Sequence, residues 1–178
     1  NLNVSRYRNG DPIPQVTNAT QWANLTTGAW CYYTNNTANG PIYGKLYNWY
    51  AVNDTRGLAP AGYHVPSDVE WTTLSTFLDG EAVAGGKMKA IGTIQGGNGL
   101  WYSPNLNATN VSGFTGLPGG NCFSNGTFYG IGNYGHFWSS NANAAALAFD
   151  RRLTKANASL ERNSSPRRYG LSVRCIKD

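Results

Sequence analysis

Charged side chains are scarce in this sequence. They make up 13% of its 178 residues, about half of the ~25% usual for soluble domains. Only nine residues are acidic and two are histidines. The dispersed carboxylates do not suggest the acid pair of a glycosidase, and neither histidine has further ligands at the spacing of a zinc site. There is no apolar run of about 18 residues, so the sequence predicts no membrane-spanning helix.

Cysteine is also rare, with three in the chain. Three are too few for a disulfide framework, although one disulfide plus a free thiol and three free thiols both remain open. A cysteine nucleophile needs a neighbouring base. Only Cys122 lies in a loop-like setting, and we interpret it as a half-buried thiol. The sequence therefore predicts no catalytic residue, no metal and no cofactor, and His64 is expected to be a structural residue.

The net charge of +5 is concentrated at one end. From Asp150 onward the chain holds eight of its 14 basic residues, against three acidic ones. A basic surface can attract nucleic acid, but no recognised nucleic-acid-binding module accompanies this charge. We therefore interpret it as a solvated face and do not expect nucleic acid to be a partner.

Glycine, asparagine and aromatic residues are abundant, which is typical of a chain rich in strands and loops. Ser67 and Glu70 form a capping box, which predicts a helix over residues 67–78, and the apolar spacing of residues 43–52 predicts an earlier one. Short strands are expected at residues 2–8, 29–33, 127–131, 136–140, 144–149, 158–162 and 171–176. This order predicts one α+β domain over residues 1–178, with two helices, short antiparallel strands and long loops.

The segment 141–167 differs from the pieces on either side of it, because it mixes small residues, arginines and asparagines. If residues 144–149 form a strand, Leu147 and Phe149 share the buried face, and Ala146, Ala148 and Asp150 point outward. Binding paratopes have a similar composition, although an ordinary loop without a partner would look the same. The expected ligand-binding residues within region 136–168 are His136, Phe137, Asn141, Asn143, Ala145, Ala146, Ala148, Asp150, Arg151, Arg152, Thr154, Asn163, Arg167 and Arg168.

Several motifs occur in the order known from one family. They are Tyr43–Val52, Leu58–Trp71, Gly85–Lys89, Ser112–Phe114, Leu117–Gly120, Phe137–Ser140 and Gly170–Cys175. Over nearly its whole length the chain resembles the Fibrobacter succinogenes major paralogous domain. That family is similar to the C-type-lectin fold, in the branch that includes the formylglycine-generating enzymes.

The resemblance implies a C-type-lectin-like fold and an extracellular place, on a cell surface or a virion. Some proteins with this fold are the variable proteins of diversity-generating retroelements, in which C-terminal codons are rewritten at adenines. Four residues depart from the pattern usual in the family: Ala145, Arg151, Arg152 and Pro166. An AAC codon can encode each of these residue types after its adenines are changed. Lys155 and Glu161 cannot be reached in this way, so these two residues would be fixed. The resemblance thus implies a variable ligand-binding protein.

Two alternatives stay open. One is a fixed adhesin or carbohydrate-binding module, and the other is an enzyme related to formylglycine generation, whose catalytic cysteine pattern is not recognisable here. Ala59 stands where relatives often have cysteine, which leaves the partner of Cys175 open. The expected partner is a macromolecule, either a protein or a cell-surface glycan, bound by a monomer. A fixed framework with a replaceable face also predicts that Trp138→Ala destabilises the fold, whereas Arg151→Ala does not.

Overall fold

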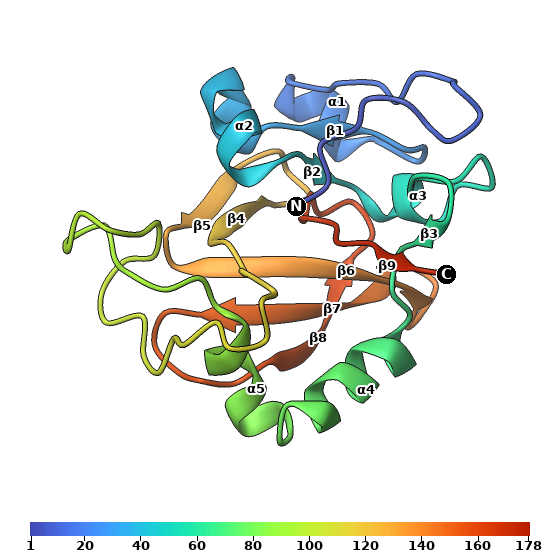
Figure 1. Ribbon diagram of the computed structural model, residues 1–178. Helices are drawn as coiled ribbons and strands as arrows, with labels where there is room; N and C mark the ends of the chain where they lie inside the picture. The colour runs from blue at the N-terminus through green and yellow to red at the C-terminus, as the bar shows by residue number, and fades with distance from the viewer.

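A curled five-stranded sheet forms the centre of the protein, an α+β structure described here over all 178 residues by a computed structural model (Figure 1). The strand order is β5-β4-β6-β7-β8. The strands are β4 (Gly119–Cys122), β5 (Phe128–Ile131), β6 (Tyr134–Ala142), β7 (Leu147–Thr154) and β8 (Glu161–Pro166). Neighbouring strands are antiparallel except for a short parallel contact between β4 and β6.

Two small sheets close the molecule around this centre. One pairs β1 (Trp30–Cys31) with β2 (Leu46–Tyr47), and the other pairs β3 (Tyr63–His64) with β9 (Ile176–Lys177). The amide of Leu2 also donates a hydrogen bond to the carbonyl of Val173. The first and last residues of the sequence therefore lie on the same side of the central sheet (Figure 1).

The helices are more numerous and shorter than expected. They are α1 (Ala19–Ala23), α2 (Gly40–Tyr43), α3 (Trp49–Val52), α4 (Asp68–Phe77) and α5 (Glu81–Met88), with 3-10 turns at Tyr33–Asn35 and Thr37–Asn39. The capping box on Ser67 and Glu70 is present at the start of α4, so the predicted helix at 67–78 is confirmed. The predicted helix at 43–52 is wrong, because Gly44 has φ +77° and the chain continues as β2 before α3.

Helix α5 was not expected, since Gly85 and Gly86 suggest a break. Both glycines are buried in the helix. A Cβ on Gly85 would come within 2.1 Å of the carbonyl oxygen of Ser159, so glycine here permits a close helix-to-loop contact rather than ending the helix. A tertiary approach of this kind leaves no mark on the local sequence pattern.

The predicted strands at 127–131 and 136–140 are confirmed as β5 and β6. The predicted strand at 144–149 is displaced toward the C-terminus, because residues 143–146 form the turn that joins β6 to β7. The strand predicted at 158–162 is displaced in the same direction, to β8. Residues 2–8 and most of 171–176 make isolated bridges and single backbone bonds instead of regular strands.

Both faces of the central sheet are covered. On one face Phe137 and Leu153 pack against Trp71 and Met88 of α4 and α5, the two helices drawn below the sheet in Figure 1. On the other face Trp138 and Ala148 pack into the core of the N-terminal half. That core also includes Tyr47, Trp49 and Leu171. No helix is both long enough and apolar enough to cross a membrane.

Candidate functional site

The N-terminal half covers only part of its face of the sheet. Beyond its edge, strands β4 to β8 form the wall of a cavity of about 300 Å³, here called the sheet cavity. Its lining residues are Asn121, Phe123, Tyr129, Tyr134, His136, Arg152, Asn163, Ser164, Ser165 and Tyr169. Small-molecule sites span ~300–1,000 Å³, so the sheet cavity has room for one ring-sized ligand group.

An aromatic wall borders this cavity. Tyr129 stacks on Phe123 at a centroid distance of 5.9 Å and on Tyr134 at 5.7 Å, with interplanar angles of 26° and 27°. Phe123 meets Tyr169 edge-on at 5.2 Å, and Tyr134 contacts the ring of His136 at 6.0 Å. The five rings thus form one continuous series of contacts. Tyr129 remains 54% exposed, so part of this wall is open to a ligand.

A buried carboxylate orients the histidine of the cavity. Asp150 is fully buried. One of its oxygens accepts a hydrogen bond from the Ser165 hydroxyl at 2.9 Å, and the other lies 3.2 Å from Nδ1 of His136. An ionised carboxylate only accepts hydrogen bonds, so Nδ1 carries the proton in this arrangement. Nε2 of His136 is then left available for a ligand.

The side-chain amide of Asn121 lacks a hydrogen-bond partner. Asn121 lies on β4 opposite Tyr129 and is only 3% exposed, yet its Nδ2 makes no hydrogen bond. A buried donor left unsatisfied costs about 1–3 kcal/mol. Gly120, with φ +64°, precedes it, and any side chain there would collide with the backbone of β5. The tight backbone around Gly120 therefore fixes the position of Asn121, although the side-chain amide of Asn121 has no hydrogen-bond partner.

Arg152 is already engaged at the side of the cavity. Its Nε donates to Oε2 of Glu161 at 2.7 Å, and its Nη2 contacts the same oxygen. Its guanidinium also lies 5.6 Å from the centroid of the Tyr134 ring. Asn157 donates to the other Glu161 oxygen at 3.1 Å. These contacts fix the guanidinium and neutralise most of its charge.

The structure divides the predicted ligand-binding residues into groups. His136, Arg152 and Asn163 meet at the sheet cavity. Asn141, Asn143, Ala145 and Ala146 are exposed at the β6–β7 turn, the opposite end of that hairpin. Arg167 and Arg168 are partly buried.

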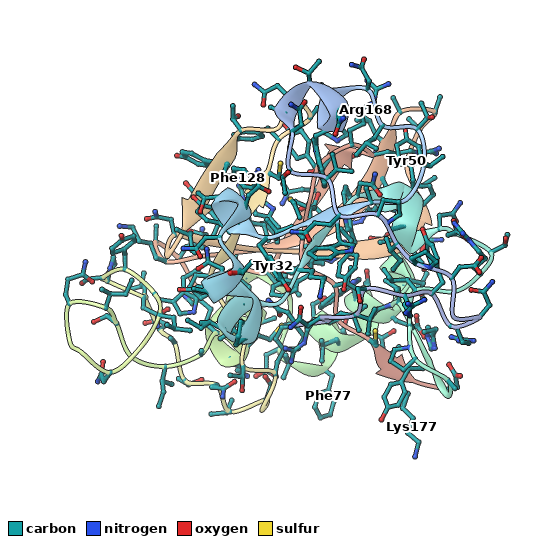
Figure 2. The ribbon with its side chains drawn as sticks, turned by 90° about the horizontal axis from the view of Figure 1, so that it is seen from above. Tyr32, Tyr50, Phe77, Phe128, Arg168 and Lys177 are labelled. Carbon is teal, nitrogen blue, oxygen red and sulfur yellow. The ribbon has the colours of Figure 1, made fainter.

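Several of these side chains also make structural contacts. The Asn141 side chain accepts a hydrogen bond from the amide of Asp68, and that of Asn143 donates to Ser164. Arg167 lies over the Trp49 ring at 4.5 Å. Arg168 donates to the carbonyl of Leu25, and Figure 2 shows it beside α1. The two arginines therefore join the C-terminal segment to the N-terminal half.

Five predicted contact residues are wrong, because they are buried. They are Phe137, Ala148, Asp150, Arg151 and Thr154. The expectation that Ala148 and Asp150 point outward from a one-sided strand is also wrong, since Leu147 and Phe149 are the partly exposed pair. The physical reason is that β7 is packed on both faces. Successive side chains along the strand therefore point alternately into two different cores.

Arg151 connects the sheet to α4. It is fully buried, and its Nη1 lies 2.6 Å from Oδ1 of Asp68. Its Nη2 donates to the Asp68 carbonyl at 3.2 Å and to the Thr72 hydroxyl at 3.1 Å. Arg162 pairs with the other Asp68 oxygen at 2.8 Å. A residue expected to contact ligand therefore belongs to the framework.

Seven cavity residues were not predicted, and most come from outside region 136–168. Asn121, Phe123, Tyr129 and Tyr134 precede it in the chain, and Tyr169 follows it. Their aromatic character was visible in the sequence. Their convergence depends on β4 lying between β5 and β6, which no local pattern encodes.

The remaining candidates for chemistry lie elsewhere. His64 is hydrogen-bonded to Glu70 at 2.8 Å and to Asp178 at 2.6 Å, contacts that join β3 to α4 and to the C-terminal segment. Cys31 and Cys122 are buried and free, and Cys175 is free and partly exposed. Burial raises the pKa of the Cys175 thiol, which makes it a weaker nucleophile at neutral pH. No cluster of three His, Cys, Asp or Glu residues is placed to hold a metal ion.

Comparison with protein families gives one match. The model of the Fibrobacter succinogenes major domain matches residues 1–177. The chain belongs to this family. Searches of curated proteins and of solved structures give no significant match. Family membership fixes the relationship of the chain, and the sheet cavity is its candidate functional site.

Proposed function

We propose that this Fibrobacter succinogenes major domain is a ligand-binding module whose recognition surface is the sheet cavity together with the exposed β6–β7 turn. The observation that carries the proposal is the composition of the cavity. Half of its ten lining residues belong to region 136–168, and four of the other five form a preformed aromatic wall. Tyrosine, serine, asparagine and arginine are the residues that binding paratopes use most.

We further propose that the architecture is C-type-lectin-like and that the chain is a variable protein of a diversity-generating retroelement. Supporting features are the curled sheet, the two longer helices and the adjacent N- and C-terminal segments. The five cavity residues within region 136–168 are all of types that AAC codons yield when their adenines change. Such a protein would act outside the cell, on a cell or virion surface.

The neighbouring DNA tests this assignment. We expect a near-copy of the codons for residues 136–175, beside a reverse-transcriptase gene, with differences mainly at adenines. The differences should fall on codons for accessible positions such as 145, 146, 152 and 163, and should spare those for the buried positions 148 and 150. The absence of such a copy would refute the retroelement part of the proposal.

A fixed adhesin is the second candidate, and one observation favours it. Asp150 and Arg151 lie in the middle of the segment and make specific buried hydrogen bonds. Replacement of either would leave a buried partner unpaired, which costs several kcal/mol. A segment with so many fixed positions also suits a surface with one constant ligand. This candidate would be favoured if versions of the protein from several isolates all bound the same ligand.

A further inference from the structure

The sheet cavity combines two kinds of surface that a ligand must satisfy together. The wall of Phe123, Tyr129, Tyr134 and Tyr169 offers ring faces and edges. The remaining lining residues, which include Asn163 and two serines, offer amide and hydroxyl groups. A purely apolar group would leave the buried side-chain amide of Asn121 without a partner, and a purely polar group would leave the rings in contact with water.

Asn121 shows which polar group is missing. Its Nδ2 is buried at the cavity and unpartnered, so a ligand that supplies an acceptor oxygen there would remove an existing penalty. His136 is held with Nδ1 toward Asp150, which leaves Nε2 for a second hydrogen bond to the ligand. Two directed bonds from neighbouring strands would orient a ring against the aromatic wall.

The charges of the cavity exclude an anionic ligand. Arg152, the one cationic side chain that is always charged there, is paired with Glu161. Behind His136 lies the buried carboxylate of Asp150. The permanent cation of the cavity is therefore paired before a ligand arrives, and an added carboxylate, sulfate or phosphate would find no free counter-charge.

We propose that the sheet cavity binds a neutral sugar ring at the end or side of a glycan, an inference that rests on the proposed ligand-binding role. One face of a pyranose presents C–H groups, which suit the rings of Tyr129 and Tyr134. Its rim presents hydroxyl oxygens, which accept from Asn121 and pair with His136 and Asn163. A phenylalanine side chain would satisfy the wall but not the buried side-chain amide of Asn121.

Glycan binding by the full chain tests this directly. The probes are the methyl glycosides of glucose, galactose, mannose and N-acetylglucosamine, with glucuronic acid and N-acetylneuraminic acid as acidic counterparts. Saturation-transfer NMR and titration should show binding of at least one neutral probe. Binding should be unchanged in EDTA, since the cavity has no cluster of three His, Cys, Asp or Glu side chains that could hold a metal ion.

Two matched variants place the binding in the cavity. Tyr129→Ala removes an exposed ring of the wall, whereas Tyr63→Ala removes a comparably exposed ring outside it. We expect Tyr129→Ala to weaken binding about tenfold or more, a change worth ~1.4 kcal/mol, and Tyr63→Ala to leave it unchanged. Asn121→Ala should weaken binding without lowering the melting temperature, because its amide makes no bond that the folded protein would lose.

Other outcomes overturn the inference. Binding of acidic probes alone, equal effects of the two tyrosine variants, or no binding of any neutral probe would each refute the sugar assignment. If a protein ligand binds at the cavity and its binding depends on Tyr129, the proposed ligand-binding role is supported and the proposal of a sugar ligand is refuted. If Tyr129→Ala affects neither sugar nor protein binding, the proposed recognition surface itself is wrong.

Discussion

Replacement of Arg151 tests whether the C-terminal segment is framework or display. Arg151→Ala removes the buried partner of Asp68 and three hydrogen bonds with it. Breaking a buried ion pair on one side costs ~3–5 kcal/mol. Asp68 keeps Arg162 and is 16% exposed, so we expect the lower end, about 3 kcal/mol. For a chain of this length that corresponds to a fall in melting temperature of roughly 6–12 °C.

Arg152→Ala is the matched control on the next residue. The Arg152 side chain is 37% exposed and its ion pair with Glu161 reaches solvent, so its loss should cost no more than ~1 kcal/mol. Urea unfolding followed by tryptophan fluorescence measures both variants, and a constant denaturant slope would show that the unfolded state is unchanged. Equal losses for the two variants would refute the assignment of Arg151 to the framework.

The pH dependence of the same variants gives a second readout. Burial of Asp68 acts to raise its pKa, but hydrogen bonds from Arg162 and Arg151 outweigh that and lower it. A lowered carboxyl pKa stabilises the fold above the unfolded value of about 3.8, and the contribution is lost as the pH falls through the folded value. The difference in unfolding free energy between wild type and Arg151→Ala should therefore shrink on acidification.

Three further results are expected. Lys89→Met should lower the free energy of unfolding, measured by urea denaturation, by about 3 kcal/mol. The Lys89 ammonium is buried and donates to three backbone carbonyls, which would lose their partner. A loss below about 1 kcal/mol would contradict this. Hydrogen bonds from Asp178 and Glu70 raise the pKa of His64, so the wild type should lose a little stability as the pH rises through that value, whereas His64→Gln should not. A thiol reagent should label one cysteine in the reduced folded protein, Cys175, and all three after unfolding; faster labelling of a second thiol would show that the others are accessible.

The sequence predicted the parts of the fold that depend on neighbours in the chain. The capping box at Ser67 is a local hydrogen-bond pattern, and it located α4 to within a residue. The helix expected at 43–52 failed for a non-local reason. Gly44 adopts a positive φ where the backbone of Leu2 approaches, and a Cβ there would lie 2.7 Å from the Leu2 carbonyl oxygen. Periodicity cannot reveal a contact between residues so far apart.

The candidate site shows the same limit. His136, Arg152 and Asn163 were predicted as ligand contacts and do line the cavity. Asp150 was assigned to the surface because strand alternation places it on the face opposite to Leu147 and Phe149, which were expected to be buried. Here its carboxylate lies in the interior and holds His136 and Ser165. The rule failed because β7 has a core on each side, a property of the whole sheet and not of the strand.

A strand packed on both sides can carry recognition only where one of its covers stops. On β7 that point is Arg152, which lies opposite His136 of β6, and β8 contributes Asn163, which lies opposite Asp150. The aromatic wall beside them comes from β5, from the first residue of β6 and from residues that follow β4 and β8, outside region 136–168. A ligand would therefore meet a constant wall and a replaceable edge. Because the wall sets the kind of ring that fits, changes at the three edge residues would alter which linkage or substituent is accepted more readily than the class of ligand.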